Sequence, residues 1–261
     1  MKFKANSHQY FNEDDNEYIS VSKLSHLLEP KKDWASIKKK FAKKNNLTVE
    51  EVSAIWENKK NKGTQAGTII HEIEEKTLID NPAPEFFDVI CKKQECPFEG
   101  EFKYSHPIEK LENNTVYPEL IIYDHDIAVC GQADKVVVVN NTLNVFDFKT
   151  DETISFEGYS NEWKKPEKYL PPISHLETCN GNMYSIKMSM YMYMLWKLNK
   201  NLRVGDLILQ QITLKRDEEG IPILSEGIPI ILSRKDVKVP YRRTEVKDIF
   251  EYYKQGKLTN E

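Results

Sequence analysis

The pattern of apolar and polar positions predicts helices over most of residues 18–66. Ser20 or Ser22 can cap a first helix, because their hydroxyls accept hydrogen bonds from free backbone N–H groups. This helix runs through Leu28 and is ended by Pro30.

Further helices follow without a break in the pattern. A second helix is predicted from about Asp33 to Lys44. Thr48 and Glu51 then form a capping box that opens a third helix, which runs through Asn58. A fourth helix is predicted to start at Gly67.

The pattern changes from helical to β-type at Val116. Turn residues at 124–126 and 140–141 separate three predicted strands. These strands are Val116–Tyr123, Ile127–Val139 and Leu143–Thr150.

The remaining segments complete the predicted fold. Residues 81–115 resemble an irregular insertion or lid, and residues 157–182 a loop. The later elements are an amphipathic helix at Met183–Leu198, a hairpin of Val204–Leu214 with Ile221–Leu232, and a helix at Glu245–Lys254. We therefore expect an α/β fold: a mixed central β-sheet flanked by helices, with a helical N-terminal part. We expect one domain, 1–261, made of a helical part (1–66), a core (67–215) and a C-terminal hairpin and helix (216–261).

The composition fits a packed globular protein. Of its 261 residues, 39% are hydrophobic and 30% charged, and no apolar run approaches the roughly 18 residues of a membrane span. The first residues lack the apolar segment of a secretory signal, so we expect a soluble intracellular protein. The four cysteines are too few and too scattered for a disulfide framework.

Charge is distributed unevenly along the chain. The net charge is +4 over residues 1–66, −12 over 67–158 and +4 over 159–261. An acidic middle between basic ends suits a carboxylate metal site beside surfaces that face a polyanion. Solvated helix faces are the alternative explanation, above all for residues 31–44.

The hairpin of residues 131–150 brings candidate catalytic groups together. If Asn140 and Asn141 form a two-residue turn, Asp134 stands opposite Asp147. Lys149 then shares their face of the sheet. A four-residue loop also keeps all three on one face, whereas a three-residue loop without a bulge does not.

Two carboxylates this close repel each other unless a cation lies between them. Oxygen ligands beside an ammonium group favour Mg²⁺ or Mn²⁺ over Zn²⁺. The alternative is a surface hairpin in which Lys149 neutralises Asp147.

These residues form two spaced elements. Gly131 and Asp134 make a GxxD element, thirteen residues before the DxK element of Asp147 and Lys149. The pair resembles the PD-(D/E)XK nuclease superfamily, whose core is restriction-endonuclease-like.

Two more segments resemble the RecB-like exonuclease branch, found in phages and in mitochondrial genome maintenance. The G-T-x-x-H run ends at His71 and is followed by Glu75. The helix around residue 190 is similar to the QxxxY helix of that branch, with Tyr191 at the Tyr position. Lys187 stands where glutamine is expected, which departs from the pattern.

The resemblance implies one or two Mg²⁺ or Mn²⁺ ions and no iron–sulfur cluster, because no cysteine follows Cys179. Lys149 would orient or deprotonate the attacking water, and Tyr191 would flank the site. The implied ligands are His71, Asp134, Asp147, the backbone carbonyl of Phe148 and an auxiliary acid, Glu119.

Aromatic and basic residues elsewhere are candidates for DNA contact. They are Trp163, Lys164, Lys165, Lys168, Lys187, Arg242 and Arg243. The chain has 32 Lys against 5 Arg, which suggests an AT-rich genome, such as many phages or low-GC bacteria have. We expect the protein in the cytoplasm of a bacterial or phage-infected cell.

We therefore expect a metal-dependent DNA nuclease, an exonuclease acting on linear or single-stranded ends. Two alternatives remain. One is an inactive nucleic-acid-binding protein of the same fold, which Lys187 favours. The other is a structure-specific endonuclease.

Overall fold

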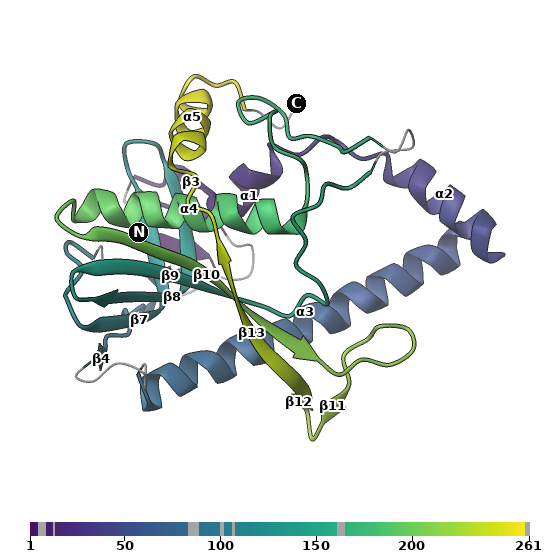
Figure 1. The fold of residues 1–261 in the computed structure, drawn as a ribbon, viewed down its shortest axis with the longest axis horizontal. Helices are drawn as coiled ribbons and strands as arrows, with labels where there is room; N and C mark the ends of the chain where they lie inside the picture. The colour runs from purple at the N-terminus through teal and green to yellow at the C-terminus, as the bar shows by residue number, and fades with distance from the viewer. Residues whose placement is uncertain are drawn as a thin grey trace.

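A large mixed β-sheet forms the centre of the protein, with helices packed on it (Figure 1). This computed structural model describes residues 1–258 except 5–8, 13, 83–88, 100–101, 106–107 and 161–164. The predicted mixed α/β class is confirmed. Within the described residues, no helix combines the length and the apolar character of a membrane span.

In the described part of the chain, the sheet contains eleven strands, and a separate hairpin adds two more. Those of the sheet are β1 (Lys2–Lys4), β2 (Gln9–Phe11), β3 (Glu17–Ser20), β4 (Ile90–Cys91), β5 (Phe98–Glu99), β6 (Phe102–Tyr104), β7 (Thr115–Asp124), β8 (Val129–Val139), β9 (Thr142–Lys149), β10 (Arg203–Leu214) and β13 (Ile231–Val239). The hairpin is β11 (Leu224–Ser225) with β12 (Ile228–Pro229). The helices are α1 (Val21–His26), α2 (Trp34–Asn45), α3 (Val49–Asp80), α4 (Asn180–Leu198) and α5 (Arg243–Lys254).

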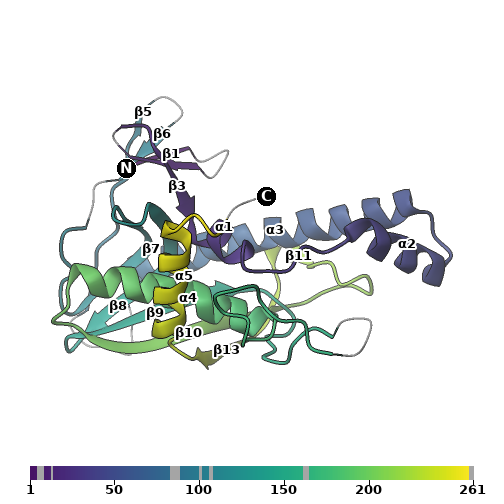
Figure 2. The same cartoon turned by 90° about the horizontal axis from the view of Figure 1, so that it is seen from above.

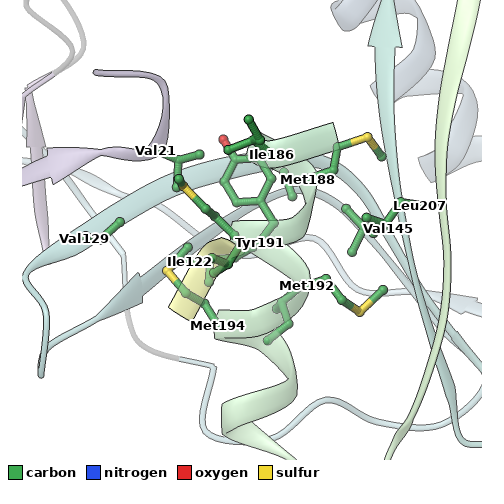
Figure 3. Close-up of a cluster of buried hydrophobic side chains, with 14 of the residues drawn as sticks. Val21, Ile122, Val129, Val145, Ile186, Met188, Tyr191, Met192, Met194 and Leu207 are labelled. Carbon is green, nitrogen blue, oxygen red and sulfur yellow. The ribbon is translucent and has the colours of Figure 1, made fainter. Parts of the chain in front are cut away.

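Alternation along β8 and β9 gives the sheet two apolar faces. Val136 and Val145 pack in one cluster beneath α4, together with residues of α1 and α5. Figure 3 shows this cluster, in which Met188 and Met192 of α4 meet the strands. A second cluster on the opposite face joins Val137, Phe146 and Phe148 to α3. The sheet is therefore covered by α4 on one face and by α3 on the other.

The β8–β9 hairpin has the predicted register. Its two-residue turn, Asn140–Asn141, has positive φ at both positions, as a type I′ turn requires. The ladder runs from Val139–Thr142 to Lys135–Phe146 and stops there. Asp134 and Asp147 therefore stand at the next position, just beyond the paired part.

One edge of β8 is shared by two different strands. Because β7 pairs with β8 along nearly its whole length, both β3 and β9 must lie on the other edge. There β3 pairs with Val129 and Cys130, and β9 pairs with residues 135–139. Residues 131–134 lie between them, so the sheet opens at the segment that carries the GxxD element.

The predicted break between the third and fourth helices is wrong. The chain from Val49 to Asp80 is one helix of 32 residues, opened by the predicted capping box. A helix-interior glycine costs only about 1 kcal/mol relative to alanine, so Gly63 and Gly67 do not end it. Burial of Ala66 and Ile70 against the sheet offsets that cost.

Other predicted boundaries also shift. The segment from Ile221 to Leu232 is not one strand, because the β11–β12 hairpin precedes β13. The N-terminal part is not purely helical, since it begins with three short strands. The predicted irregular segment 81–115 contains β4, β5 and β6.

Alanine substitutions at Gly131 and Gly63 should change the free energy of unfolding in opposite directions. A Cβ on Gly131 would lie 2.6 Å from Cε1 of buried Tyr191, so Gly131→Ala should destabilise the fold by about 1–3 kcal/mol. A Cβ on Gly63 meets nothing within 4 Å, so Gly63→Ala should stabilise it by about 1 kcal/mol. Urea unfolding monitored by circular dichroism measures both; equal effects would contradict this packing.

Candidate metal centre

Asp134 lies where the β8–β9 ladder ends, and its side chain continues the hydrogen bonding. Its Oδ2 accepts a 2.7 Å hydrogen bond from the backbone N–H of Phe148. The carboxyl group is thus inserted between the two strands, and the residue is 8% exposed. A buried carboxylate needs hydrogen bonds and a compensating charge.

Glu119 faces Asp134 from the other neighbouring strand. Its flanking pairs, Pro118–Lys135 and Leu120–Ala133, set it opposite Asp134. Its backbone has φ 46°, a left-handed conformation that costs a non-glycine residue about 1–3 kcal/mol. The strained backbone of Glu119 therefore lies beside two other polar side chains, those of Asp134 and His71. Strained residues of this kind cluster at functional sites.

His71 reaches the same point from α3. Its Nδ1 lies 3.4 Å from Glu119 Oε1 and 3.7 Å from Asp134 Oδ1. The imidazole packs edge-on against the ring of Phe148, with centroids 5.8 Å apart. Ile70, the preceding residue of α3, is fully buried, and its burial holds the helix in place beside Asp134.

These three side chains can act as one ligand set. Single donor atoms of His71, Glu119 and Asp134 all lie within 4.8 Å of one another. One imidazole nitrogen with two carboxylate oxygens suits first-row divalent ions and Mg²⁺. The donor set therefore fits the predicted Mg²⁺ or Mn²⁺.

The electrostatics of the cluster also favour a cation. Burial, and then the charge of Asp147, raise the pKa of Asp134 to about 7. Burial lowers the pKa of His71, but the hydrogen bond to Glu119 and the charge of Asp134 outweigh it and raise that pKa to about 9. Both groups hold protons that a metal ion would displace.

Asp147 and Lys149 lie beside the cluster on β9. The Lys149 ammonium contacts Asp147 Oδ2 and donates a 3.0 Å hydrogen bond to the carbonyl of Phe148. Burial lowers the pKa of Lys149, but Asp147 and Asp134 outweigh it and raise that pKa. Asp147 and the Phe148 carbonyl, both predicted metal ligands, therefore contact Lys149 in this structure. The contact between Lys149 and Asp147 is the one that the alternative interpretation of the hairpin predicts.

One face of α4 borders Lys149. The ammonium group of Lys149 lies 5.2 Å from the ring centre of Tyr184. The Tyr184 hydroxyl donates a 2.5 Å hydrogen bond to Asp151. Burial and the charge of Lys149 lower the pKa of Lys187. Tyr191 is buried against Gly131, and burial followed by the Asp147 charge raises its pKa. The predicted α4 face therefore flanks the carboxylates.

Asp151 was missing from the predicted site. The period of two that places Asp147 and Lys149 on one face also includes position 151, which was the available signal. It follows the last residue of β9 by two positions and fixes Tyr184 beside Lys149.

A cleft of about 740 Å³ opens beside His71 and Glu119. The α3 face from Thr64 to Glu75 forms one wall, and residues of β7 and β8 form the other. Lys93 and Gln94 lie at its border. The cluster is therefore reachable from solvent along α3.

The residues predicted to contact DNA are dispersed. Trp163 and Lys164 lie outside the described residues. Lys165 and Lys168 are exposed in the loop before α4, where the backbones of Lys168 and Glu177 form an isolated antiparallel β-bridge.

The two arginines at the start of α5 have contacts within the protein. Arg242 donates hydrogen bonds to Ser185 and Asn182 of α4. Arg243 lies over the ring of Trp196 at 4.5 Å. Neither residue lines the cleft beside His71.

In comparisons with known proteins, the chain matches no protein-family model and no curated protein. The fold and the geometry of the cluster therefore carry the functional argument.

Glu119→Gly should stabilise the metal-free protein while removing a ligand. Glycine adopts φ 46° without strain, so we expect a gain of about 1 kcal/mol in unfolding free energy and much weaker Mn²⁺ binding. Ala128→Gly, at φ 52° in a turn, should gain similar stability and bind Mn²⁺ normally. Normal Mn²⁺ affinity in Glu119→Gly would contradict the ligand assignment.

Metal binding should release protons. Below pH 7 an entering Mg²⁺ displaces protons from both Asp134 and His71, between pH 7 and 9 chiefly from His71, and above pH 9 from neither. Affinity should therefore rise with pH from 6 to 9 and then level off. Calorimetry in buffers of different ionisation enthalpy counts the protons. At pH 7, His71→Ala should release one proton fewer than the unaltered protein, and His175→Ala the same number. A count near zero for the unaltered protein at that pH would exclude these groups as ligands.

Proposed function

We propose that this protein is a metal-dependent DNA nuclease that hydrolyses phosphodiester bonds and acts as an exonuclease on linear or single-stranded ends. One observation carries the proposal. Separate elements, α3, β7 and β8, converge to put His71, Glu119 and Asp134 within 4.8 Å of one another, and Lys149 lies on the adjoining strand.

Each side chain has a role that its position allows. His71, Glu119 and Asp134 would hold the divalent ion, with Asp147 released from Lys149 as a further ligand. The bound ion would lower the pKa of water and neutralise charge on the scissile phosphate. Lys149, held on the edge of the cluster by the Phe148 carbonyl, would orient the attacking water and stabilise the developing negative charge.

The resemblance in the sequence supports the same activity. The GxxD and DxK elements, which resemble the PD-(D/E)XK superfamily, lie on neighbouring strands beside the helix that carries the G-T-x-x-H run. This order is that of the RecB-like branch with its restriction-endonuclease-like core. We place the activity on DNA in the cytoplasm of a bacterial or phage-infected cell.

An inactive DNA-binding protein of the same fold is the second candidate. The contact between Lys149 and Asp147 favours it, because it occupies a carboxylate that catalysis would require. Lys187 near Lys149 adds positive charge where the branch has an amide. An endonuclease is the third candidate.

A cleavage assay separates the three candidates. We expect the protein with Mg²⁺ or Mn²⁺ to degrade a labelled linear strand and to leave a closed circle intact. Loss of both substrates would indicate an endonuclease, and binding without cleavage would indicate the inactive protein.

Asp134→Asn identifies the catalytic site in this assay. It should abolish cleavage and keep DNA binding, because it removes a buried ligand and its negative charge. Asp206→Asn, an exposed acid paired with Lys238 on β13, is the matched control and should cleave normally. Cleavage by Asp134→Asn at the unaltered rate would place the activity elsewhere.

A further inference from the structure

The helices α2 and the first half of α3 project from the body of the protein (Figures 1 and 2). We call residues 34–62 the arm. Its only fully buried side chains in the described structure are Ala42 and Val52. The arm therefore exposes most of its surface, including apolar groups.

Aromatic rings gather on the arm. Trp34 is 56% exposed, and its ring meets the edge of Trp56 at a centroid distance of 6.3 Å. Phe41 is 40% exposed and lies 5.5 Å from Trp56. Ile37 and Ile55 are exposed on the same two helices. A contiguous exposed apolar patch of this kind marks a binding surface.

The same segment is strongly basic. Residues 34–62 contain eight lysines and three acidic residues. Lys32 lies 6.0 Å from the ring centre of Trp34 and 5.1 Å from that of Tyr159, an exposed residue before α4. Aromatic rings interleaved with lysines are the equipment with which proteins bind single-stranded nucleic acid, stacking bases and pairing phosphates.

A continuous path joins the arm to the metal centre. A cleft of about 670 Å³ begins at Trp56 and ends at Thr150 and Asp151, directly after Lys149. Thr64 lines both this cleft and the one beside His71. The α3 residues along it recur every three or four positions and so share one helix face. They are Trp56, Lys60, Thr64, Gly67 and His71.

We propose that the arm binds a single strand of DNA and that the strand follows this face of α3 to the metal centre. The inference rests on the proposed nuclease function and adds its substrate class. Stacking on Trp34 and Phe41 needs unpaired bases, so the arm selects single strands over duplex. A protein partner would not account for the lysine excess or for the cleft that leads from Trp56 to Thr150 and Asp151.

The helix geometry sets the strand length. Trp56 precedes His71 by fifteen positions, which is about 22 Å along an α-helix. At about 3.4 Å per stacked nucleotide, six or seven nucleotides span that distance. A strand of five nucleotides therefore cannot contact Trp56 and the metal centre at the same time, whereas a strand of twenty can.

The test is fluorescence anisotropy with labelled oligothymidylates in EDTA, where no cleavage occurs. Trp34→Ala should weaken binding of the 20-mer about tenfold and leave binding of a blunt 20-base-pair duplex unchanged. Trp34→Phe should restore most of the affinity. Leu232→Ala, an exposed apolar residue on β13, is the control and should change nothing.

Charge reversals test the lysines in the same assay. Lys39→Glu with Lys43→Glu, both on exposed positions of α2, should weaken 20-mer binding and flatten its salt dependence. Lys200→Glu with Lys235→Glu changes net charge equally at exposed positions outside the arm and should have a much smaller effect.

The outcomes separate this inference from the nuclease proposal. If DNA binding depends on Trp34 but the unaltered protein does not cleave DNA with Mg²⁺ or Mn²⁺, the arm is still a DNA-binding surface and the nuclease assignment fails. If the protein cleaves DNA but Trp34→Ala binds the 20-mer normally, the arm inference fails alone. It is also overturned if the unaltered protein does not bind the 20-mer, or if Trp34→Ala only converts a dimer to a monomer.

Discussion

The buried carboxyl group of Asp134 is the constraint on which the rest of the site depends. It occupies the position where the β8–β9 ladder would continue, and it accepts the Phe148 N–H in place of a backbone carbonyl. Burial and the nearby Asp147 make its negative charge unfavourable, so the group requires a proton or a cation. A sheet that closed normally here would have no such requirement.

The opening in the sheet also explains how both layers of helices reach one point. With residues 131–134 unpaired on that edge, Tyr191 of α4 packs onto Gly131 from one face. His71 of α3 approaches Asp134 from the other face. Glu119 completes the set through a strained backbone that regular pairing would not select. The same break in regular structure thus unites a helix and two strands in one ligand set.

Local signals in the sequence were sufficient for much of the fold. The two-residue Asn140–Asn141 turn predicted the hairpin register, because the length of the turn fixes which residues pair across the ladder. The Thr48–Glu51 capping box marked the start of α3 correctly. His71 and Glu119 were placed at the site by resemblance alone, since no local pattern connects α3 or β7 to β8.

Features set by tertiary contacts were not predictable in this way. Gly67 suggested the start of a separate helix, which burial of Ile70 and Ala66 overrides. The strands β1 to β3 are too short for a periodic signal. At Asp134 a side-chain hydrogen bond replaces the next backbone hydrogen bond of the ladder, and this depends on three-dimensional packing. The contact between Lys149 and Asp147 depends on packing in the same way.

Anomalous diffraction from a crystal soaked in Mn²⁺ tests the central claim most directly, because it locates the ion without reference to activity. The account predicts a strong anomalous peak for an Mn²⁺ ion coordinated by His71, Glu119 and Asp134. It predicts that the Lys149 ammonium then moves away from Asp147. A crystal with Mn²⁺ bound only at other acidic groups, such as Asp124 and Asp126, and with Lys149 still on Asp147, would contradict it.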